Sequence, residues 1–335
     1  MTTLALLPDP VTPLSLESAE AAFGDILDGH VPDKVVAEFL TELALRDETS
    51  IEIAAAARAL RARMIALQAP AGAIDVCGTG GDGAHSLNIS TAVAIVVAAC
   101  GVPVAKHGNR AASSRAGAAD TLEALGLDLD RAAAAAPDSL AALGIGFLFA
   151  QTFHPALGRL AAVRKAIGRR TIFNIVGPLC NPARVTRQLM GVARTDYLGT
   201  VADALRLLGS ESAMIVAGDE GLDEMSIAGG SRVIRLGRCG VTGSWREEHV
   251  EPADAGLSPH PLAAIRGGDA GFNAAALAAL LAGERGAYRD AVLLNAAAAL
   301  IVADEATDWI DGADRAARAI EDGAARALLA AWIAF

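Results

Sequence analysis

The sequence contains little cysteine and no apolar run long enough to cross a membrane. Cysteine occurs at four scattered positions, 77, 100, 180 and 239, with no CxxC pair, which excludes a disulfide framework. The most apolar stretches, 91–105 and 291–303, are shorter than the ~20 residues of a membrane-spanning helix. The first residues also lack the basic and apolar segments of a signal peptide. These absences predict a soluble cytoplasmic protein that does not bind membranes.

Basic residues are too few to balance the acidic ones. The chain of 335 residues has 28 Lys and Arg against 39 Asp and Glu, a formal net charge of −11. Nucleic-acid binding depends on a basic face that displaces counterions from phosphates, so the charge balance argues against nucleic acid as a partner. With 53% hydrophobic and 20% charged residues, the composition is that of a globular protein. The length is sufficient for two domains or one large one.

The apolar pattern changes along the chain. From Leu16 to about Leu67 apolar residues recur at helical spacing, with breaks near 29–32 and 47–50, which predicts three helices. After a linker at 69–72, short strand-like runs alternate with longer helical segments. The strand-like runs are 73–77, 102–105, 146–149, 213–217 and 232–236. Alternation of this kind is typical of an α/β fold with a mainly parallel sheet.

These patterns predict two domains. The first is a small helical domain over residues 1–69, joined by part of residues 155–187, which carry a second Pro- and Gly-rich passage. The second is a larger α/β domain over residues 70–335. From Asn273 onward we expect mostly alanine-rich helix, including 289–304 and 313–330.

A glycine-rich segment, 75–83, follows a predicted strand and precedes 88–91 and a long apolar helix. Glycines let the backbone approach an anion closely, and a helix N-terminus adds free N–H groups and a favourable dipole. The segment therefore predicts a cradle for phosphate or pyrophosphate, with a plain tight turn as the alternative.

The same segment formally fits the dinucleotide-binding pattern GxGxxG at Gly78, Gly80 and Gly83. Two features count against that interpretation. Residues 84–87 delay the start of the helix, and no acidic residue lies between Asp82 and Asp120, where a ribose-binding acid is expected. No Gly-Lys-Ser/Thr closes the loop, so it is not a Walker loop either.

Lysine is scarce as well, because only Lys34, Lys106 and Lys165 occur among the 28 basic residues. Between residues 83 and 119 the charged side chains are Lys106, Arg110 and Arg115, with no acid. We expect Lys106 in a basic loop that follows the predicted strand at 102–105. Such a patch concentrates positive potential on an anion, and a lysine ammonium binds phosphate as a point charge. The alternative is a solvated basic loop. A histidine such as His107 is, by itself, more often structural than catalytic.

An acidic pair, Asp223 and Glu224, lies in a loop after the predicted strand at 213–217. Mg²⁺ takes one or two carboxylates together with waters and substrate phosphates. Alone, such a pair is usually a solvated turn. The interpretation as a Mg²⁺ site is favoured here because the chain already has a predicted polyphosphate site.

Taken together, these motifs resemble the anthranilate phosphoribosyltransferases. The resemblance covers nearly the whole chain in five ordered motifs: 78–83 with 88–91; 106–110 with 113–114; 146–149 with 154–155 and 163–165; 171–174 with 177–178 and 181–182; and 223–224. It implies transfer of the phosphoribosyl group of 5-phosphoribosyl 1-pyrophosphate to the amine of anthranilate, with release of pyrophosphate, in tryptophan biosynthesis. It also implies the nucleoside phosphorylase/phosphoribosyltransferase type of fold, two Mg²⁺ per subunit and a homodimer formed through the helical domain.

The resemblance further implies roles for individual residues. Those expected to bind phosphoribosyl pyrophosphate are Gly78, Gly81, Asp82, Ser86, Asn88, Ile89, Ser90, Thr91, Lys106, His107, Gly108, Asn109, Arg110, Ser113 and Ser114. Those expected to hold anthranilate are Gly78, Asn109 and Arg164, and those expected to hold Mg²⁺ are Ser90, Asp223 and Glu224. Ser86 replaces a threonine common among relatives and keeps the hydroxyl, whereas Ala118 replaces a phosphate-contacting serine and does not.

The expected chemistry assigns the catalytic roles to Lys106, Asn109 and Arg164. Charge develops on the departing pyrophosphate, so the metals and Lys106 stabilise the leaving group. The aryl amine is neutral at pH 7 and needs positioning rather than a strong base. A guanidinium pairs with a carboxylate in a fork, which suits Arg164, predicted to lie late in a helix over 155–167, to the carboxylate of anthranilate.

The sequence leaves two alternative functions open. A pyrimidine nucleoside phosphorylase shares the fold but uses inorganic phosphate and needs no pair of Mg²⁺ ions, so Asp223 and Glu224 favour the transferase. A non-catalytic relative that binds nucleic acid is the other, and the net charge and the intact motifs count against it.

Overall fold

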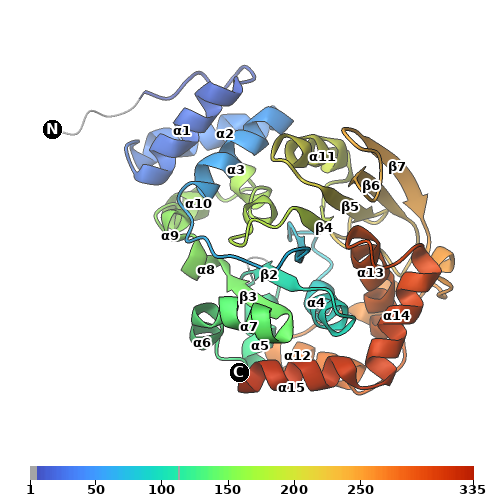
Figure 1. Cartoon of the computed structure of the whole chain (residues 1–335). Helices are drawn as coiled ribbons and strands as arrows, with labels where there is room; N and C mark the ends of the chain where they lie inside the picture. Colours follow the sequence, from blue (N-terminus) through green and yellow to red (C-terminus); the bar gives the residue numbers. More distant parts are fainter. Residues whose placement is uncertain (1–5, 112–113) are drawn as a thin grey trace.

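The chain begins with three helices that form a unit beside a sheet (Figure 1). In this computed structural model, which describes residues 6–111 and 114–335, the helices are α1 (Leu16–Asp28), α2 (Asp33–Leu45) and α3 (Ser50–Arg61). They end and restart where the sequence predicts. Helix α3 begins with a capping box, in which the Thr49 side chain accepts from the backbone N–H of Glu52 and the Glu52 carboxylate accepts from Thr49.

The sheet has seven strands in the order β3-β2-β1-β4-β5-β6-β7. Neighbours from β3 to β5 pair in parallel, and β6 and β7 are antiparallel additions at one edge. The predicted mainly parallel α/β sheet is therefore confirmed. The strands are β1 (Ile74–Gly78), β2 (Val104–Gly108), β3 (Ile145–Phe149), β4 (Arg187–Gly191), β5 (Ser212–Gly218), β6 (Ser231–Gly237) and β7 (Trp245–Val250).

Two of these strands are not predicted by the sequence pattern. Strand β4 lies in the middle of the sheet, yet it reads Arg-Gln-Leu-Met-Gly and so lacks the apolar run of a central strand. Its Gln188 is polar but can be buried without a large cost in free energy, because the side-chain amide donates to the carbonyl of Pro178 at 2.7 Å. Strand β7 forms the exposed edge and is mostly polar, so its pattern does not distinguish it from a loop.

The remaining α-helices surround the sheet, some packed directly on its two faces and others outside those helices (Figure 1). They are α4 (Ile89–Ala99), α5 (Ala118–Ala124), α6 (Leu129–Ala134), α7 (Ala136–Leu143), α8 (Ala150–Phe153), α9 (Pro155–Gly158), α10 (Ala161–Ile167), α11 (Leu198–Leu207), α12 (Ala270–Leu281), α13 (Ala287–Val302), α14 (Trp309–Glu321) and α15 (Ala324–Ala334). Short 3-10 turns are η1 (Ile172–Asn174), η2 (Pro178–Cys180), η3 (Thr195–Tyr197), η4 (Pro252–Ala255) and η5 (Leu262–Ile265).

Two predicted helices are interrupted in the structure. The helix expected over 155–167 is divided into α9 and α10, with Arg159 and Leu160 between them. The helix expected over 313–330 is divided into α14 and α15 at Gly323, whose φ of 76° is left-handed. Alanine-rich segments have strong helical propensity throughout, so propensity alone does not locate such breaks.

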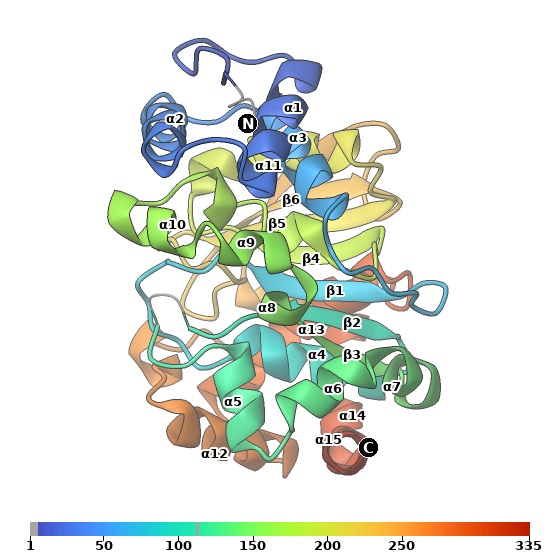
Figure 2. The ribbon, with the colours of Figure 1, turned by 90° about the vertical axis from the view of Figure 1, so that its left-hand side faces the viewer.

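Two apolar cores lie on opposite faces of the sheet. One joins the sheet to α4 and α13, whose central residues are fully buried. The other joins the sheet and α11 to α1–α3. The segment 155–187 contributes to this second core, since the rings of Phe23 and Phe173 pack edge to face with their centroids 6.1 Å apart. Figure 2 shows α9 and α10 lying beside the amino-terminal helices.

In the part of the chain that the structure describes, no helix combines the length and apolar character that crossing a membrane requires.

Candidate active site

The carboxyl ends of four neighbouring parallel strands carry glycines, and the predicted site gathers there. Strand β1 ends at Gly78, β2 at Gly108, β4 at Gly191 and β5 at Gly218. In open parallel sheets ligands bind outside this edge of the strands. The glycine-rich segment 79–88 connects β1 to α4 across the same edge.

A close approach by Asp223 explains two of these glycines. A Cβ on Gly191 would lie 1.6 Å from the Asp223 carbonyl oxygen, and one on Gly78 would lie 2.3 Å from Asp223 Oδ2. Neither position has room for a side chain. Gly78 belongs to the predicted motif, whereas Gly191 gives no signal in the sequence because it stands alone after an unrecognised strand.

Glu224 is buried and Asp223 half-buried, and both are held by backbone amides of the predicted phosphate segment. Asp223 Oδ2 accepts from the N–H of Gly80 at 2.6 Å, and Glu224 Oε1 accepts from the N–H of Ser90 at 3.2 Å. Burial, and next the charge of Asp82, raise the pKa of Asp223 to about 7. Burial, and next the charge of Asp223, raise the pKa of Glu224 to about 8.

This cluster of acids fits a divalent cation. The Asp82 carboxylate accepts from the N–H of Ala84 through Oδ1, while its buried Oδ2 has no hydrogen-bond partner among the described residues. Within that part of the chain no three His, Cys, Asp or Glu side chains enclose a metal position. Mg²⁺ needs only one or two carboxylates and completes its shell with water and substrate phosphate oxygens, so the carboxylates present fit this ion.

Lys106 lies in strand β2, not in the loop after it as predicted. Its side chain is 2% exposed, and its ammonium donates to the carbonyl of Val76 at 2.7 Å and to Ser90 Oγ at 3.3 Å. Burial lowers the pKa of Lys106, and the buried Asp75 below it opposes that shift. Lys106 is thus fixed beneath the first turn of α4, next to the acid cluster.

His107 pairs with a second histidine. Its Nε2 lies 3.2 Å from Nε2 of His154, and both rings are buried. Burial, and next the neighbouring His154, lower the pKa of His107 to about 3, so the pair is neutral at pH 7 and one ring donates to the other. The bond links β2 to the segment that leads into α10.

Arg164 lies on α10, and Asn109 lies in the exposed loop that follows β2. Burial is the cause of the lowered pKa of Arg164, since no carboxylate among the described residues lies near enough to contribute. Asn109 Oδ1 accepts from the N–H of Arg110 at 2.8 Å. Arg164 is therefore a half-buried cation without a counter-ion in that part of the chain.

Arg110 is engaged by acids of helix α5. Its Nη1 donates to Asp120 and to Glu123, both at 2.8 Å. The guanidinium also lies 5.7 Å from the ring centre of Phe149. Since Asp120 and Glu123 follow the acid-free stretch directly, the local excess of positive charge is smaller than the sequence alone indicates.

The other predicted residues lie along the same edge. Ser86 pairs with Arg266, Ile89 begins α4, and Thr91 Oγ1 is buried without a partner in the described chain. Gly81 lies in the glycine-rich segment, Gly108 ends β2, and the Ser114 hydroxyl donates to the carbonyl of Ala116 at 3.3 Å. Asn88 turns its side chain toward α5 and α12. Ser113 lies outside the described residues.

Two further side chains at this site are not predicted by the sequence. Arg170 Nη1 donates to the carbonyl oxygens of Gly80 at 2.9 Å and Gly81 at 3.2 Å, and so braces the glycine-rich segment. The Tyr288 hydroxyl donates to the carbonyl of Asn88 at 3.1 Å. Arg170 directly precedes the motif at 171–174 but is 90 residues from Gly80, and Tyr288 is far from every motif, so only the fold brings these contacts together.

The chain matches two parts of one protein family. Residues 10–64 match the glycosyl transferase family, helical bundle domain, and residues 71–326 match the glycosyl transferase family, a/b domain. The anthranilate phosphoribosyltransferase of Novosphingobium aromaticivorans is 61% identical over 331 residues, 99% of each chain. The chain belongs to the anthranilate phosphoribosyltransferase family. Membership confirms the predicted enzyme class and function in preference to the two alternatives.

Solved structures of anthranilate phosphoribosyltransferases have the same fold. The enzyme of Thermus thermophilus has a TM-score of 0.90 at 40% identity, and the match covers 96% of each chain. The enzyme of Saccharomyces cerevisiae, in complex with phosphoribosyl pyrophosphate and Mg, has a TM-score of 0.86 at 29% identity over 96% of this chain and 93% of that one. The predicted fold class is confirmed.

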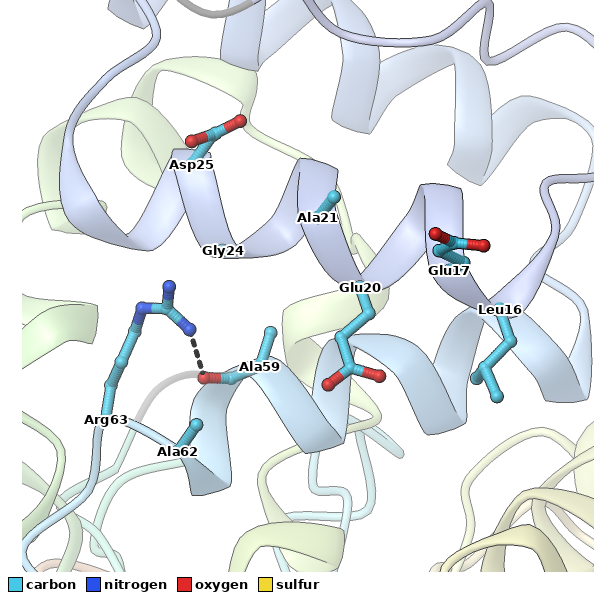
Figure 3. A pocket seen from close by; sticks show the side chains of 9 residues that line it. All are labelled: Leu16, Glu17, Glu20, Ala21, Gly24, Asp25, Ala59, Ala62 and Arg63. Atoms are coloured by element: carbon cyan, nitrogen blue, oxygen red, sulfur yellow. Dashed lines mark hydrogen bonds between the residues drawn. The ribbon is translucent and has the colours of Figure 1, made fainter.

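A separate hollow of about 640 Å³ lies between α1 and α3 (Figure 3). Leu16, Ala21 and Ala62 contribute apolar surface, and Arg63 closes one end, where its Nη1 donates to the carbonyl of Ala59 at 2.9 Å. The hollow is an open groove on the helical unit and shares no lining residue with the candidate active site.

Proposed function

We propose that the carboxyl edge of the sheet transfers the phosphoribosyl group of 5-phosphoribosyl 1-pyrophosphate to the amine of anthranilate. One observation carries the proposal: Ser90 is contacted by both Lys106 and Glu224, so a buried cation and a buried acid meet at the N-terminus of α4. A helix N-terminus with a fixed ammonium favours a polyanion, and the acid favours the metal that accompanies it.

Lys106 stabilises the departing pyrophosphate in this assignment. Its ammonium is already fixed by Val76 and Ser90, so little reorganisation is needed as negative charge grows on the leaving group. The hydroxyl groups of Ser90 and Thr91 and the amides of the glycine-rich segment would bind the phosphates. Lys106 and Thr91 are buried, and limited access of water strengthens their interactions.

Arg164 and Asn109 hold the acceptor. The guanidinium of Arg164 lacks a counter-ion among the described residues and would pair with the carboxylate of anthranilate. Asn109 and Gly78 would border the aromatic ring. Since the amine is the nucleophile in its neutral form, the contribution of these residues is orientation toward the anomeric carbon.

Asp223, Glu224 and Ser90 are the residues that would hold magnesium, with two ions per subunit. When bound, Mg²⁺ neutralises pyrophosphate oxygens and polarises the bond to the leaving group. The raised pKa values of both acids and the unpartnered Asp82 oxygen support this assignment.

The activity is tested by fluorescence. Purified protein given anthranilate, phosphoribosyl pyrophosphate and Mg²⁺ should consume the fluorescent anthranilate, and each omission should prevent the decrease. Constant fluorescence with all three present would overturn the assignment.

We further propose that residues 1–69, with part of 155–187, form a helical domain and that residues 70–335 form the catalytic domain. We also propose that two chains associate through their helical domains in a homodimer. The open groove between α1 and α3 supports this, as do exposed apolar residues of the helical unit such as Val35 and Ile51. Light scattering should give twice the mass of one 34.0 kDa chain. The substitution Ala21→Arg should lower it, whereas Ala278→Arg on α12 should not.

A cytoplasmic location is also proposed. All four cysteines are free thiols, which suits a reducing compartment. Fractionation of producing cells would test it, and recovery in the membrane pellet would contradict it.

A further inference from the structure

The side chain of Asn88 makes three hydrogen bonds, none of them with its own helix. Its Oδ1 accepts from Thr121 Oγ1 at 2.5 Å and from Asn273 Nδ2 at 2.8 Å. Its Nδ2 donates to the carbonyl of Ala116 at 3.3 Å. Every partner lies outside the segment that connects β1 to α4, so the amide of Asn88 is directed toward α5 and α12.

This arrangement is unusual for the position that Asn88 occupies. Asn88 is the N-cap of α4, but its side chain makes no capping hydrogen bond. An asparagine there ordinarily accepts from a backbone N–H of the first turn. Elsewhere in the chain, Ser15, Asp128 and Asp269 cap their helices in that way. Two N–H groups of the first turn of α4 have other partners, since that of Ile89 donates to the carbonyl of Leu87 at 2.7 Å and that of Ser90 to Glu224 Oε1 at 3.2 Å. The N–H of Thr91, which a capping side chain would bond, has no backbone partner among the described residues.

A second observation indicates that a ligand belongs at this helix end. The Thr91 side chain, also in the first turn, is 1% exposed, and its hydroxyl has no partner among the described residues. A buried hydroxyl without a hydrogen bond is costly unless a ligand or water completes it. An anion at the N-terminus of α4 would satisfy it and would also be favoured by the helix dipole.

Asn273 is itself rigidly held. It is 2% exposed, its Oδ1 accepts from the N–H of Gly268 at 2.8 Å, and its backbone N–H donates to the carbonyl of Asp269 at 3.0 Å. Thr121 is fully buried on α5. Two fixed donors thus converge on one oxygen of Asn88 from different elements of the fold.

We propose that Asn273 and Thr121 are positioning residues that prevent Asn88 from capping α4 and so leave the N–H and hydroxyl of Thr91, beside the Ser90 N–H that Glu224 accepts from, for a phosphate group of phosphoribosyl pyrophosphate. The Asn88 amide also donates to the carbonyl of Ala116 and so joins the loop after β2 to the segment before α4. This hydrogen bond fixes the positions of the two phosphate-binding segments relative to each other. The inference rests on the proposed function, because it assigns the donor phosphate to this helix end.

The test uses variants that remove only the donor. Asn273→Asp keeps the oxygen that accepts from Gly268 but removes the N–H donated to Asn88, and Thr121→Val keeps the shape but removes the hydroxyl. Each variant should raise the KM for phosphoribosyl pyrophosphate about tenfold, the effect of one such interaction, with the KM for anthranilate changed less than about twofold at saturating donor. Thr121→Ser retains the hydroxyl, so its KM for phosphoribosyl pyrophosphate should equal that of the unmodified protein.

A matched control separates positioning from loss of stability. Ser212 is fully buried at the opposite end of β5, and its hydroxyl donates to the carbonyl of Val302 at 2.9 Å. Ser212→Ala should lower the unfolding temperature without changing either KM. If Asn273→Asp and Thr121→Val change both KM values equally, or change neither, the positioning role is wrong.

Calorimetric titration with phosphoribosyl pyrophosphate and Mg²⁺ distinguishes the two possible failures. If the unmodified protein binds the donor but does not consume anthranilate, the proposed function fails. The inference is then decided by binding alone: weaker binding to Asn273→Asp supports it, and equal binding overturns it.

Discussion

At the scale of single residues, Lys106 shows how the fold determines the role of a side chain. The sequence predicts a lysine in a loop that reaches for phosphate, but the structure buries that lysine in β2 under the first turn of α4. Its contacts with Val76 and Ser90 hold the ammonium in one place. A preorganised charge of this kind stabilises a developing anion better than a mobile one.

Arg164 provides a direct test of the acceptor site. Arg164→Ala should raise the KM for anthranilate at least about tenfold and the KM for phosphoribosyl pyrophosphate less than about twofold, because one charge-assisted pair is worth ~1.5–3 kcal/mol. Arg164→Lys keeps the charge but not the fork and should lie between the two. Initial rates with each substrate varied would show this. Equal effects on both KM values would remove Arg164 from the acceptor site.

The acid pair predicts a pH-dependent requirement for magnesium. The pKa values of Asp223 and Glu224 are raised to about 7 and about 8, so below these values protons compete with the metal. The apparent affinity for Mg²⁺ should rise between about pH 6 and pH 8.5, up to ~tenfold per pH unit for each proton displaced.

Magnesium titrations of the rate at several pH values would measure this dependence. Glu224→Gln removes one titrating group and should flatten the upper part of the profile. An affinity that is constant over this range in the unmodified protein would contradict the assignment.

Gly191 is expected to tolerate no side chain. In Gly191→Ala the new Cβ would lie 1.6 Å from the Asp223 carbonyl oxygen, so the loop that carries Asp223 and Glu224 must move. Activity should fall at least ~100-fold, because misplacing catalytic groups by about 1 Å lowers the rate by about that factor. Gly158→Ala, where a Cβ meets nothing within 4 Å, is the matched control and should retain activity in the fluorescence assay.

How far the sequence predicted the site depends on what each residue contacts. Residues of the motifs, such as Lys106 and Glu224, lie together as expected because parallel strand ends meet at one edge. Gly191 and Arg170 could not be found in this way, because their importance arises from close contacts with segments distant in sequence. The roles predicted for substrate contacts remain predictions.

At the scale of elements, periodicity predicted best where burial is one-sided. Helices α1 and α2 follow the predicted breaks, since an apolar stripe repeats against a polar face. Strand β4 was missed because Arg187 and Gln188 occupy a central strand, where the hydrogen bond of Gln188 with Pro178 replaces apolar packing. Side-chain hydrogen bonds of this kind leave no periodic signal.

Glu52 makes the start of α3 sensitive to acid. It is fully buried and accepts from Leu14, Thr49 and Arg46. Burial alone would raise the pKa of Glu52, but hydrogen bonds led by that of Arg46 lower it below 4.5. The stabilisation is therefore present above pH 4.5 and is lost as pH falls through the folded value.

Removing the carboxylate should have a large effect. Glu52→Ala should reduce the free energy of unfolding at pH 7 by ~3–5 kcal/mol, since it leaves Arg46 without its partner, and the difference should narrow toward about pH 3. Urea unfolding at both pH values would measure it. Glu17→Ala, at an exposed position of α1 without an ion pair among the described residues, is the control.

At the scale of the whole molecule, the helical unit and the sheet share one core. Residues of α1–α3 pack in the same cluster as those of β4, β5 and α11, so neither part buries its apolar surface alone. Urea should therefore unfold the chain in one transition. All three tryptophans, Trp245, Trp309 and Trp332, lie beyond the helical unit, so their fluorescence reports the α/β part, while far-UV circular dichroism reports both. Loss of dichroism before fluorescence would contradict a shared core.

The burial of Lys106 has a practical consequence for handling the protein. Amine-reactive dyes and surface-coupling chemistry modify accessible lysines, and Lys34 and Lys165 are exposed while Lys106 is not. The chain can therefore be labelled or immobilised through its lysine side chains without derivatising the ammonium that β2 carries.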